Sequence, residues 1–226
     1  MSAVHDDFAV EPIRGLPEML PEGEHILWQG SPRWQTLARS AYHVDLVAVY
    51  FAILMVARGV YDFSQKGDAV HALMASSALL PLALSAIGLL ALVARMTSRA
   101  TVYTITNKRV VLRIGVALTK AINLPFSAIG SAAMRSRTDG TGDIVLRLQG
   151  DDRIGFGHLW PHVRPWQLRN PEPMLRAIPG ISGVAIQLSR AMQGAARLRG
   201  ASVTAPRRTE SNVEPIRKVA RFPVAS

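Results

Sequence analysis

The side chains best suited to chemistry gather in one ten-residue segment, 157–166, which reads GHLWPHVRPW. Its two histidines are four positions apart, a spacing that could ligate zinc or a porphyrin metal from one face of a helix. Pro161 lies between them and disfavours a regular helical turn, and no third ligand stands nearby. Tryptophan and histidine on a proline-stiffened loop instead favour recognition of a protein partner or of the lipid headgroup zone. The four candidate partner-binding residues of this segment are His158, Trp160, His162 and Trp166.

Signatures of catalysis are otherwise missing from the sequence, which has no phosphate-binding glycine loop, no GxSxG elbow and no HExxH motif. The absence of cysteine excludes disulfides, thiolate metal sites and cysteine nucleophiles. His43 and His71, near the ends of two apolar segments, could ligate the magnesium of bacteriochlorophyll. An isolated histidine at a helix end is more typical of polar anchoring. We therefore expect a protein that is not an enzyme and that holds no metal and no cofactor.

Charge is distributed unevenly along the 226 residues, whose net charge is +10. Residues 1–24 contain six acidic residues and one arginine, a net charge of −5, and lack the basic and apolar regions of a signal peptide. From residue 95 to the end, 21 basic and 7 acidic residues give a net charge of +14. Only 6% of the residues are aromatic, which disfavours a nucleic-acid binder that stacks bases. An anionic lipid surface is the alternative partner for this positive charge.

Two apolar segments predict a membrane-spanning helical hairpin. Residues 70–94 carry no formal charge apart from His71 and are long enough to cross the roughly 30 Å hydrocarbon core. Residues 41–61 have a shorter uncharged centre, so a re-entrant or interfacial helix is the alternative there. The polar residues 62–68 predict a tight turn between the two helices. Because more basic residues flank the outer ends of the hairpin than its turn, the positive-inside rule places both termini in the cytoplasm.

The second apolar segment carries small residues and a proline at spacings of four, four and three. This spacing places them along one face of a helix, with a kink at the proline. Small side chains let another helix approach closely in lipid, where apolarity alone does not drive association. The face could serve packing within the hairpin or contact with another molecule, including a second copy of this chain. The residues of this candidate partner-binding face are Ser77, Pro81, Ser85 and Gly88.

Beyond residue 97 the hydrophobic period changes to that of β-strands, and turn residues separate several short apolar runs. Such regular short strands predict a small antiparallel sheet or barrel. The expected strands are residues 102–106, 110–112, 121–124, 129–134, 143–148 and 153–156.

The C-terminal part predicts helix and then an irregular tail. Residues 171–178 are expected to form a short helical turn that Pro179 and Gly180 end. Apolar residues then recur at helical spacing over 179–199, which predicts an amphipathic basic helix. It either packs on the sheet or lies on an anionic membrane, and its two internal glycines favour packing because they weaken an isolated helix. Residues 200–226 are basic, punctuated by proline and expected to be disordered.

Three blocks of sequence resemble known bacterial proteins. The run 103–111, YTITNKRVV, followed by Gly115 and by INLP at 122–125, resembles the opening hairpin of bacterial PH-like domains found beside membrane hairpins. The upstream block 20–34 and the downstream block 156–162 narrow the likeness to photosynthetic complex assembly proteins of purple phototrophic bacteria. The resemblance covers residues 16–178 and brings no catalytic residues with it.

This resemblance implies an α+β membrane protein: an N-terminal transmembrane hairpin, then a small antiparallel PH-like β domain with a C-terminal helix. The expected divisions are an acidic cytoplasmic segment 1–40, the hairpin 41–96, the PH-like domain 97–178, the helix 179–199 and the tail 200–226. The implied function is assembly of the photosynthetic reaction centre and its core light-harvesting complex in the bacterial inner or intracytoplasmic membrane. Its implied partners are subunits of those complexes. The alternative is a membrane-anchored module that binds anionic lipid headgroups or another envelope complex.

Overall fold

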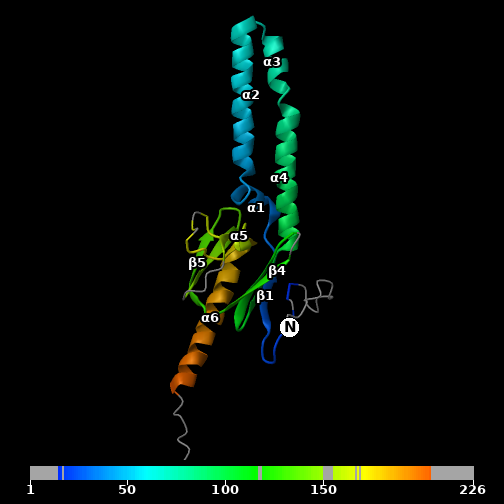
Figure 1. Cartoon of the computed structure of the whole chain (residues 1–226). Coiled ribbons are helices and arrows are strands. Elements are labelled where there is room, and N and C mark those ends of the chain that lie inside the picture. Colours follow the sequence, from blue (N-terminus) through cyan, green and yellow to red (C-terminus); the bar gives the residue numbers. More distant parts are fainter. Residues whose placement is uncertain are drawn as a thin grey trace, which may run out of the picture.

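The computed structural model describes residues 15, 16, 18–116, 119–149, 155–165, 167 and 169–204. A long helical hairpin projects from one end of a module built from two β-sheets and a C-terminal helix (Figure 1). The hairpin consists of α2 (Val44–Lys66), α3 (Ala69–Ser77) and α4 (Leu80–Ala100). The prediction of two long apolar helices followed by antiparallel strands and a helix is confirmed.

The turn at the tip of the hairpin is shorter than the sequence predicted. Residues 62–66 remain helical, and Arg58 forms an ion pair with Asp62 one turn later, at 2.7 Å, which supports the last turns of α2. Helix α2 ends at Lys66, and the next residue, Gly67, has a φ of 65°, the left-handed conformation that glycine adopts without strain. Asp68 then caps α3 by accepting a hydrogen bond from the Val70 amide at 2.9 Å. Only residues 67 and 68 therefore separate the two helices.

The second apolar segment is interrupted as its proline predicted. In an unbroken helix the ring of Pro81 would meet the carbonyl of Ser77, four residues earlier, and could not donate to it. Helix α3 accordingly ends at Ser77, and α4 begins at Leu80 with the proline in its first turn. The last turns of α4 reach into the module, where Ala94, Thr97 and Ser98 are buried.

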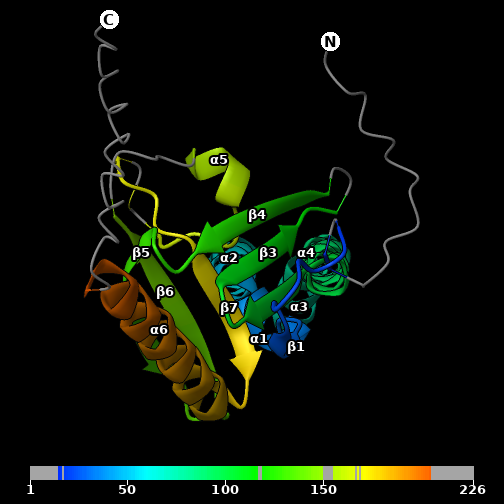
Figure 2. The ribbon, with the colours of Figure 1, turned by 90° about the horizontal axis from the view of Figure 1, so that it is seen from below.

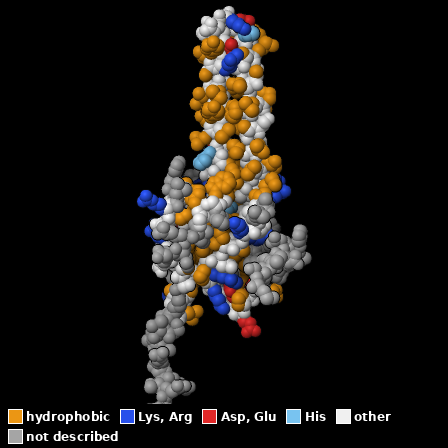
Figure 3. Space-filling view, viewed as in Figure 1, with side chains coloured by type: hydrophobic (Ala, Val, Ile, Leu, Met, Phe, Trp, Pro, Cys, Tyr) orange, Lys and Arg blue, Asp and Glu red, His pale blue; other side chains and the backbone are white. Residues whose placement is uncertain are grey.

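The hairpin presents apolar side chains on its outside. Residues 44–66 and 69–100 are each long and apolar enough to cross a membrane. Only 0% and 11% of their most apolar windows are buried, which distinguishes them from core helices of a soluble domain. Figure 3 shows hydrophobic side chains around the hairpin and charged ones at its tip and on the module. Exposed apolar residues include Leu46, Ile53, Val60, Leu73, Leu84 and Leu89.

Two antiparallel sheets form the module. The first has the order β1-β2-β3-β4, with β1 (Ile26–Gly30), β2 (Val102–Thr106), β3 (Arg109–Ile114) and β4 (Lys120–Pro125). The second has the order β5-β6-β7, with β5 (Ile129–Ser136), β6 (Thr141–Leu148) and β7 (Met174–Pro179). Strands β2 to β6 match the predicted strands to within a few residues. The first sheet pairs residues far apart in sequence, since Gln29 of β1 lies opposite Thr104 of β2.

The hydrophobic core lies between the sheets and α6 (Ile181–Thr204). Helix α6 lies across the β5–β6 sheet (Figure 2) and buries Ile181, Val184 and Leu188 at helical spacing. Packing of this amphipathic helix on the sheet, which the sequence favoured over a membrane-surface position, is confirmed. Fully buried sheet residues of the same core include Tyr103, Ile105, Leu112, Ile144, Leu146 and Leu175.

Several local predictions are wrong. Residues 174–179 form strand β7, not part of a helical turn, because they pair with β6 and complete the second sheet. Phe156 begins the short helix α5 (Phe156–Leu159), whereas a strand was predicted there; residues 153 and 154 lie outside the described part. Residues 26–40 are not a separate terminal segment, since they supply β1 and helix α1 (Trp34–Ser40), which buries Leu37. Helix α6 continues to Thr204, so the prediction that the irregular tail begins at residue 200 is also wrong, and the tail from residue 205 lies outside the described residues.

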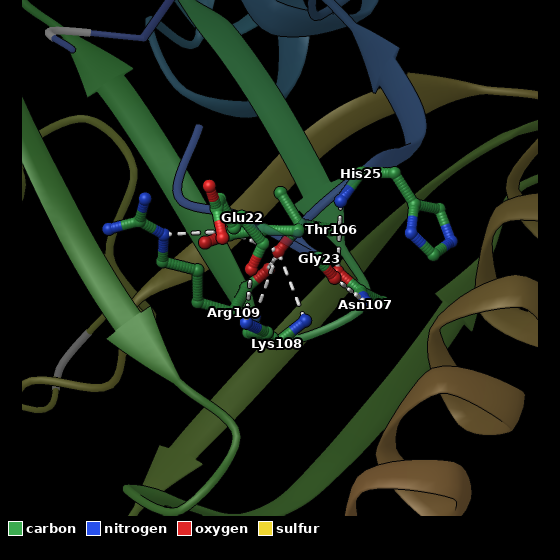
Figure 4. A network of polar contacts seen from close by, with 8 residues as sticks. Glu22, Gly23, His25, Thr106, Asn107, Lys108 and Arg109 are labelled. Carbon is green, nitrogen blue, oxygen red and sulfur yellow. Dashed lines mark hydrogen bonds and ion pairs between the residues drawn. The ribbon is translucent and has the colours of Figure 1, made fainter. Parts of the chain in front are cut away.

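Two blocks that carry the sequence resemblance meet at the β2–β3 turn (Figure 4). The buried Glu24 carboxylate accepts hydrogen bonds from the Thr106 hydroxyl and the Arg109 guanidinium, both at 2.8 Å. The Asn107 side chain accepts from the His25 amide at 3.1 Å and donates to the Gly23 carbonyl at 2.9 Å. The charge-assisted hydrogen bonds of Glu24 and the neutral ones of Asn107 together hold the 22–25 loop against the turn. Both blocks therefore have a structural role at this position.

Candidate functional site

The predicted recognition segment is divided between the core and the surface. His162 is fully buried, and its ring lies edge-to-face with that of Tyr103, their centroids 5.6 Å apart. Its Nδ1 is 2.6 Å from the Tyr103 hydroxyl and its Nε2 is 3.1 Å from the Thr101 hydroxyl. The interpretation of His162 as part of an exposed surface is therefore wrong, because its two ring nitrogens are used inside the module.

The hydrogen bonds around His162 determine which of the buried atoms carry protons. The Tyr103 hydroxyl accepts the Arg176 amide at 3.1 Å, so its own proton is available to the histidine Nδ1. A neutral ring with its proton on Nε2 then donates to Thr101. Burial, with a smaller contribution from the positive charge of Arg176, lowers the pKa of His162 to about 3. We call this set, Thr101, His162, Tyr103 and the Arg176 amide, the buried polar chain.

The buried polar chain ties the segment after α5 to strands β2 and β7, and thereby places Trp160. This tryptophan is 53% exposed, and its ring meets that of Tyr42 edge-to-face at 5.6 Å. The Tyr42 hydroxyl is 2.7 Å from that of Thr97 in the last turns of α4. Trp160 therefore lies where the hairpin joins the module. The side chain of His158 and the whole of Trp166 lie outside the described residues.

The small-residue face is left open by the packing of the hairpin. Pro81, Ser85 and Gly88 are exposed along one side of α4, and a Cβ added at Gly88 would meet no atom within 4 Å. The Ser85 hydroxyl is satisfied within the helix, since it donates to the Pro81 carbonyl at 2.7 Å. Ser77 is half-buried in α3, across the helix break from the other three, and its hydroxyl donates to the Met74 carbonyl at 2.9 Å.

Packing inside the hairpin uses a different set of small residues. Gly59 of α2 lies over α3, where a Cβ would come 3.5 Å from the Ser76 hydroxyl oxygen. Ala72 and Ala83 are also buried, on α3 and α4. The sequence left two uses open for Pro81, Ser85 and Gly88, packing within the hairpin or contact with another molecule. Other residues provide the packing within the hairpin.

An apolar groove of about 560 Å³ lies between α2 and α3, and no pattern in the sequence predicted it. Its floor includes Gly59, whose missing side chain leaves room between the helices. The groove opens outward on the half of the hairpin nearer its tip. Its other lining residues are Met55, Val56, Val60, Phe63, Ala69, Ala72, Leu73 and Ser76.

Metal-binding chemistry finds no support in the part of the chain that the structure describes, which brings no three histidine or acidic side chains together. His71 lies at the tip of the hairpin, with its Nε2 2.6 Å from the ammonium nitrogen of Lys66. His43 lies immediately before α2 with a φ of 52°. That no cofactor is bound stays a prediction.

Comparison with known proteins places this architecture in a family. The chain is 39% identical over 188 residues to a Rhodobacter capsulatus protein described as an uncharacterized 23.7 kDa protein in the puhA 5′ region. That match covers 83% of this chain and 88% of the relative. A crystal structure of a DUF1696 family protein with a pleckstrin-homology domain from Shewanella loihica PV-4 matches 41% of this chain and 71% of its own, with 14% identity and a TM-score of 0.28. Residues 46–192 match the family described as bacterial PH domain, and the chain belongs to that family.

Proposed function

We propose that the protein is a membrane-anchored assembly factor of the PuhB type, which promotes maturation of the photosynthetic reaction centre and its core light-harvesting complex. It would act by contact and not as an enzyme. The Rhodobacter capsulatus relative supports a link to photosynthesis through its position in the puhA 5′ region. The exposed apolar hairpin supports a position in the bilayer, where transmembrane partners would meet it.

The orientation that we propose follows from the basic residues at the two ends of the hairpin. Arg39 precedes α2, and Arg95 and Arg99 lie in the last turns of α4, whereas the tip offers Lys66. By the positive-inside rule the module would lie in the cytoplasm, against the inner or intracytoplasmic membrane. Trp160 and Tyr42, at the base of the hairpin, would then lie in the headgroup zone that favours aromatic side chains.

The observation that carries the proposal is the open face of Pro81, Ser85 and Gly88. These residues serve no packing within the hairpin, yet they provide the close approach that helix association in lipid requires. A helix of an incomplete photosynthetic complex is the partner that we propose for this face. A second copy of this chain is the competing occupant.

The test is to replace Gly88 with leucine and to purify the full-length protein from a strain that is building its photosystem. The Cβ of the new side chain has open space, so the hairpin should fold, but a partner helix could no longer approach. We expect recovery of reaction-centre and core antenna subunits with the protein to fall sharply. Ala57→Leu is the matched control, because Ala57 is also exposed but lies on α2. Equal recovery with both variants would refute this contact face, and loss of self-association alone would assign it to a homodimer.

A further inference from the structure

A second cavity lies on the face of the β5-β6-β7 sheet opposite to α6. Its volume is about 560 Å³, and it is lined from both sheet and loop by five arginines and two acidic residues. Alternate residues of β5 and β6 line it. Among their neighbours, Ile144 lines the α6 side of the sheet, and Met134 borders both sides. We call it the arginine cavity. Its charged residues are Arg135, Arg137, Arg147, Arg164, Arg176, Asp143 and Glu172.

The two carboxylates of the arginine cavity are already matched. Asp143 accepts both guanidinium nitrogens of Arg137, at 3.1 and 2.5 Å. Glu172 accepts one nitrogen from Arg147 and one from Arg164, each at 2.9 Å. Although burial alone would raise the pKa of Glu172, these hydrogen bonds lower it below its usual value, so the carboxylate stays ionised.

Two arginines are left in excess. Within the residues that the structure describes, neither Arg135 nor Arg176 forms an ion pair. Arg176 is only 8% exposed, and burial lowers the pKa of its guanidinium from the usual value. The Asp143 carboxylate, which already pairs with Arg137, offsets only part of the cost of burying this cation. A bound anion would offset the rest.

Unused hydrogen-bonding atoms lie beside the buried cation. The Nε of Arg176 and the Oγ of Ser40 are both buried and have no partner among the described residues. The Arg176 Nη1 reaches the Ser40 carbonyl at 3.5 Å, so the two side chains are close neighbours in the cavity wall. Buried donors are nearly always satisfied in folded proteins, and these two unsatisfied atoms belong to residues that line the cavity. The wall therefore offers donors and positive charge to an acceptor with several oxygens.

The position of the arginine cavity indicates where such an acceptor comes from. Helix α1 lies at the base of the apolar hairpin (Figure 1), Ser40 is its last residue, and α2 begins four residues later. The cavity that Ser40 lines is therefore close to that base. The Trp160 and Tyr42 rings lie at the same junction. Val145 and Met174 add apolar lining between the arginines. Phosphate next to apolar glycerol and acyl groups occurs at this depth of a bilayer surface.

We propose that the arginine cavity binds the phosphate of an anionic phospholipid headgroup from the adjacent leaflet, with Arg176, Arg135 and the Ser40 hydroxyl as its donors. Guanidinium groups suit phosphate because their planar donors match two oxygens at once. The site is separate from the α4 face and does not depend on the assembly function. It would fix the height and tilt of the module on the membrane. Free phosphate shares this chemistry, and an acidic peptide, such as residues 1–24 of this chain, is the competing ligand.

The experiment titrates phosphatidylglycerol onto the full-length protein in detergent and counts bound lipid by native mass spectrometry. We expect one saturable lipid, not seen with phosphatidylcholine, and about tenfold weaker binding by Arg135→Gln, which loses one charged donor. Arg176→Gln should weaken it further. Arg190→Gln is the control, since it removes an equal charge from the exposed side of α6, outside the cavity.

Each control measurement either supports or overturns the proposal. Because Arg176 is buried, its variant counts only if its thermal unfolding matches that of the control; Arg135 is exposed and keeps the test open if it does not. Weak displacement of the lipid by inorganic phosphate supports the proposal. Phosphate that binds in the absence of any lipid binding overturns it, and so does saturable binding of a peptide with the sequence of residues 1–24 without lipid. Equal lipid binding by Arg135→Gln and Arg190→Gln also overturns it.

Discussion

The hairpin and the module place their apolar side chains in opposite ways. The hairpin keeps its large apolar side chains outside and packs its helices through Gly59, Ala72 and Ala83. The module buries its apolar side chains and adds polar contacts, of which the Glu24 contacts and the buried polar chain are examples. The difference shows that the module is stabilised by its own interior, whereas the surface of the hairpin is matched to an apolar environment. If the hairpin lies in the bilayer as proposed, contacts with transmembrane partners are therefore expected from the hairpin first.

The largest expected effect comes from the same substitution made in each region. Leu175→Ala in β7 would leave a cavity in the core and should lower the free energy of unfolding of the module by about 2–5 kcal/mol. Leu89→Ala in α4 removes an equal side chain that is 61% exposed, and should leave the module's unfolding unchanged. Chemical denaturation of the full-length protein in detergent, followed by the near-ultraviolet signal of its aromatic residues, measures both. Equal losses would contradict the division into two regions.

An intermediate effect is expected from acid, and it should act on the module. His162 has a pKa of about 3 when folded and a usual value near 6.5 when unfolded. Between these values the unfolded chain binds a proton that the folded chain does not, so stability falls as the pH drops below about 6.5. At pH 5 the loss due to this residue should be about 2 kcal/mol.

The variant His162→Gln sharpens this prediction. Glutamine can accept from Tyr103 and donate to Thr101 but does not titrate. It should therefore be less sensitive to acid than the native protein between pH 7 and 5, even if its stability at pH 7 is lower. Thermal unfolding across that range measures the slope. The same slope in both proteins would show that His162 is not the group that titrates.

The smallest effect is expected where the two regions meet. Trp160→Ala removes the ring contact with Tyr42 and should lower the free energy of unfolding by about 1 kcal/mol, because the tryptophan is half-exposed. It should nevertheless reduce quenching of the protein's fluorescence by headgroup-labelled lipid in reconstituted bilayers. Trp34→Phe provides a reference for loss of one indole. If Trp160→Ala loses no more quenching than Trp34→Phe does, Trp160 does not lie at the lipid surface.

Local patterns predicted much of the fold. Turn residues between short apolar runs predicted β2 to β6, Pro81 predicted the helix break, and helical spacing of apolar residues predicted α6. Strand β7 was missed because residues 171–178 begin with two prolines and read equally well as a helix start; only pairing with β6 decides the matter. Strand β1 was missed because its partner β2 lies about 75 residues further along the chain.

The site was predicted only in part, for the same reason. Small residues at helical spacing indicated the face of α4, but which face packs within the hairpin depends on Gly59 of another helix. His162 looked like a surface residue because its partner Tyr103 is 59 residues away. The arginine cavity collects residues from β5, β6, β7 and α1, and no spacing in the sequence brings these together.

Photocrosslinking from the α4 face tests the central claim most directly. A photoreactive amino acid at Ser85, in membranes of a strain that is assembling its photosystem, should capture reaction-centre or core antenna polypeptides, identified by mass spectrometry. The same probe at Ala57 on α2 should not capture them. Capture of lipid alone, of a second copy alone, or of the same polypeptides from both positions would contradict an assembly role for this face.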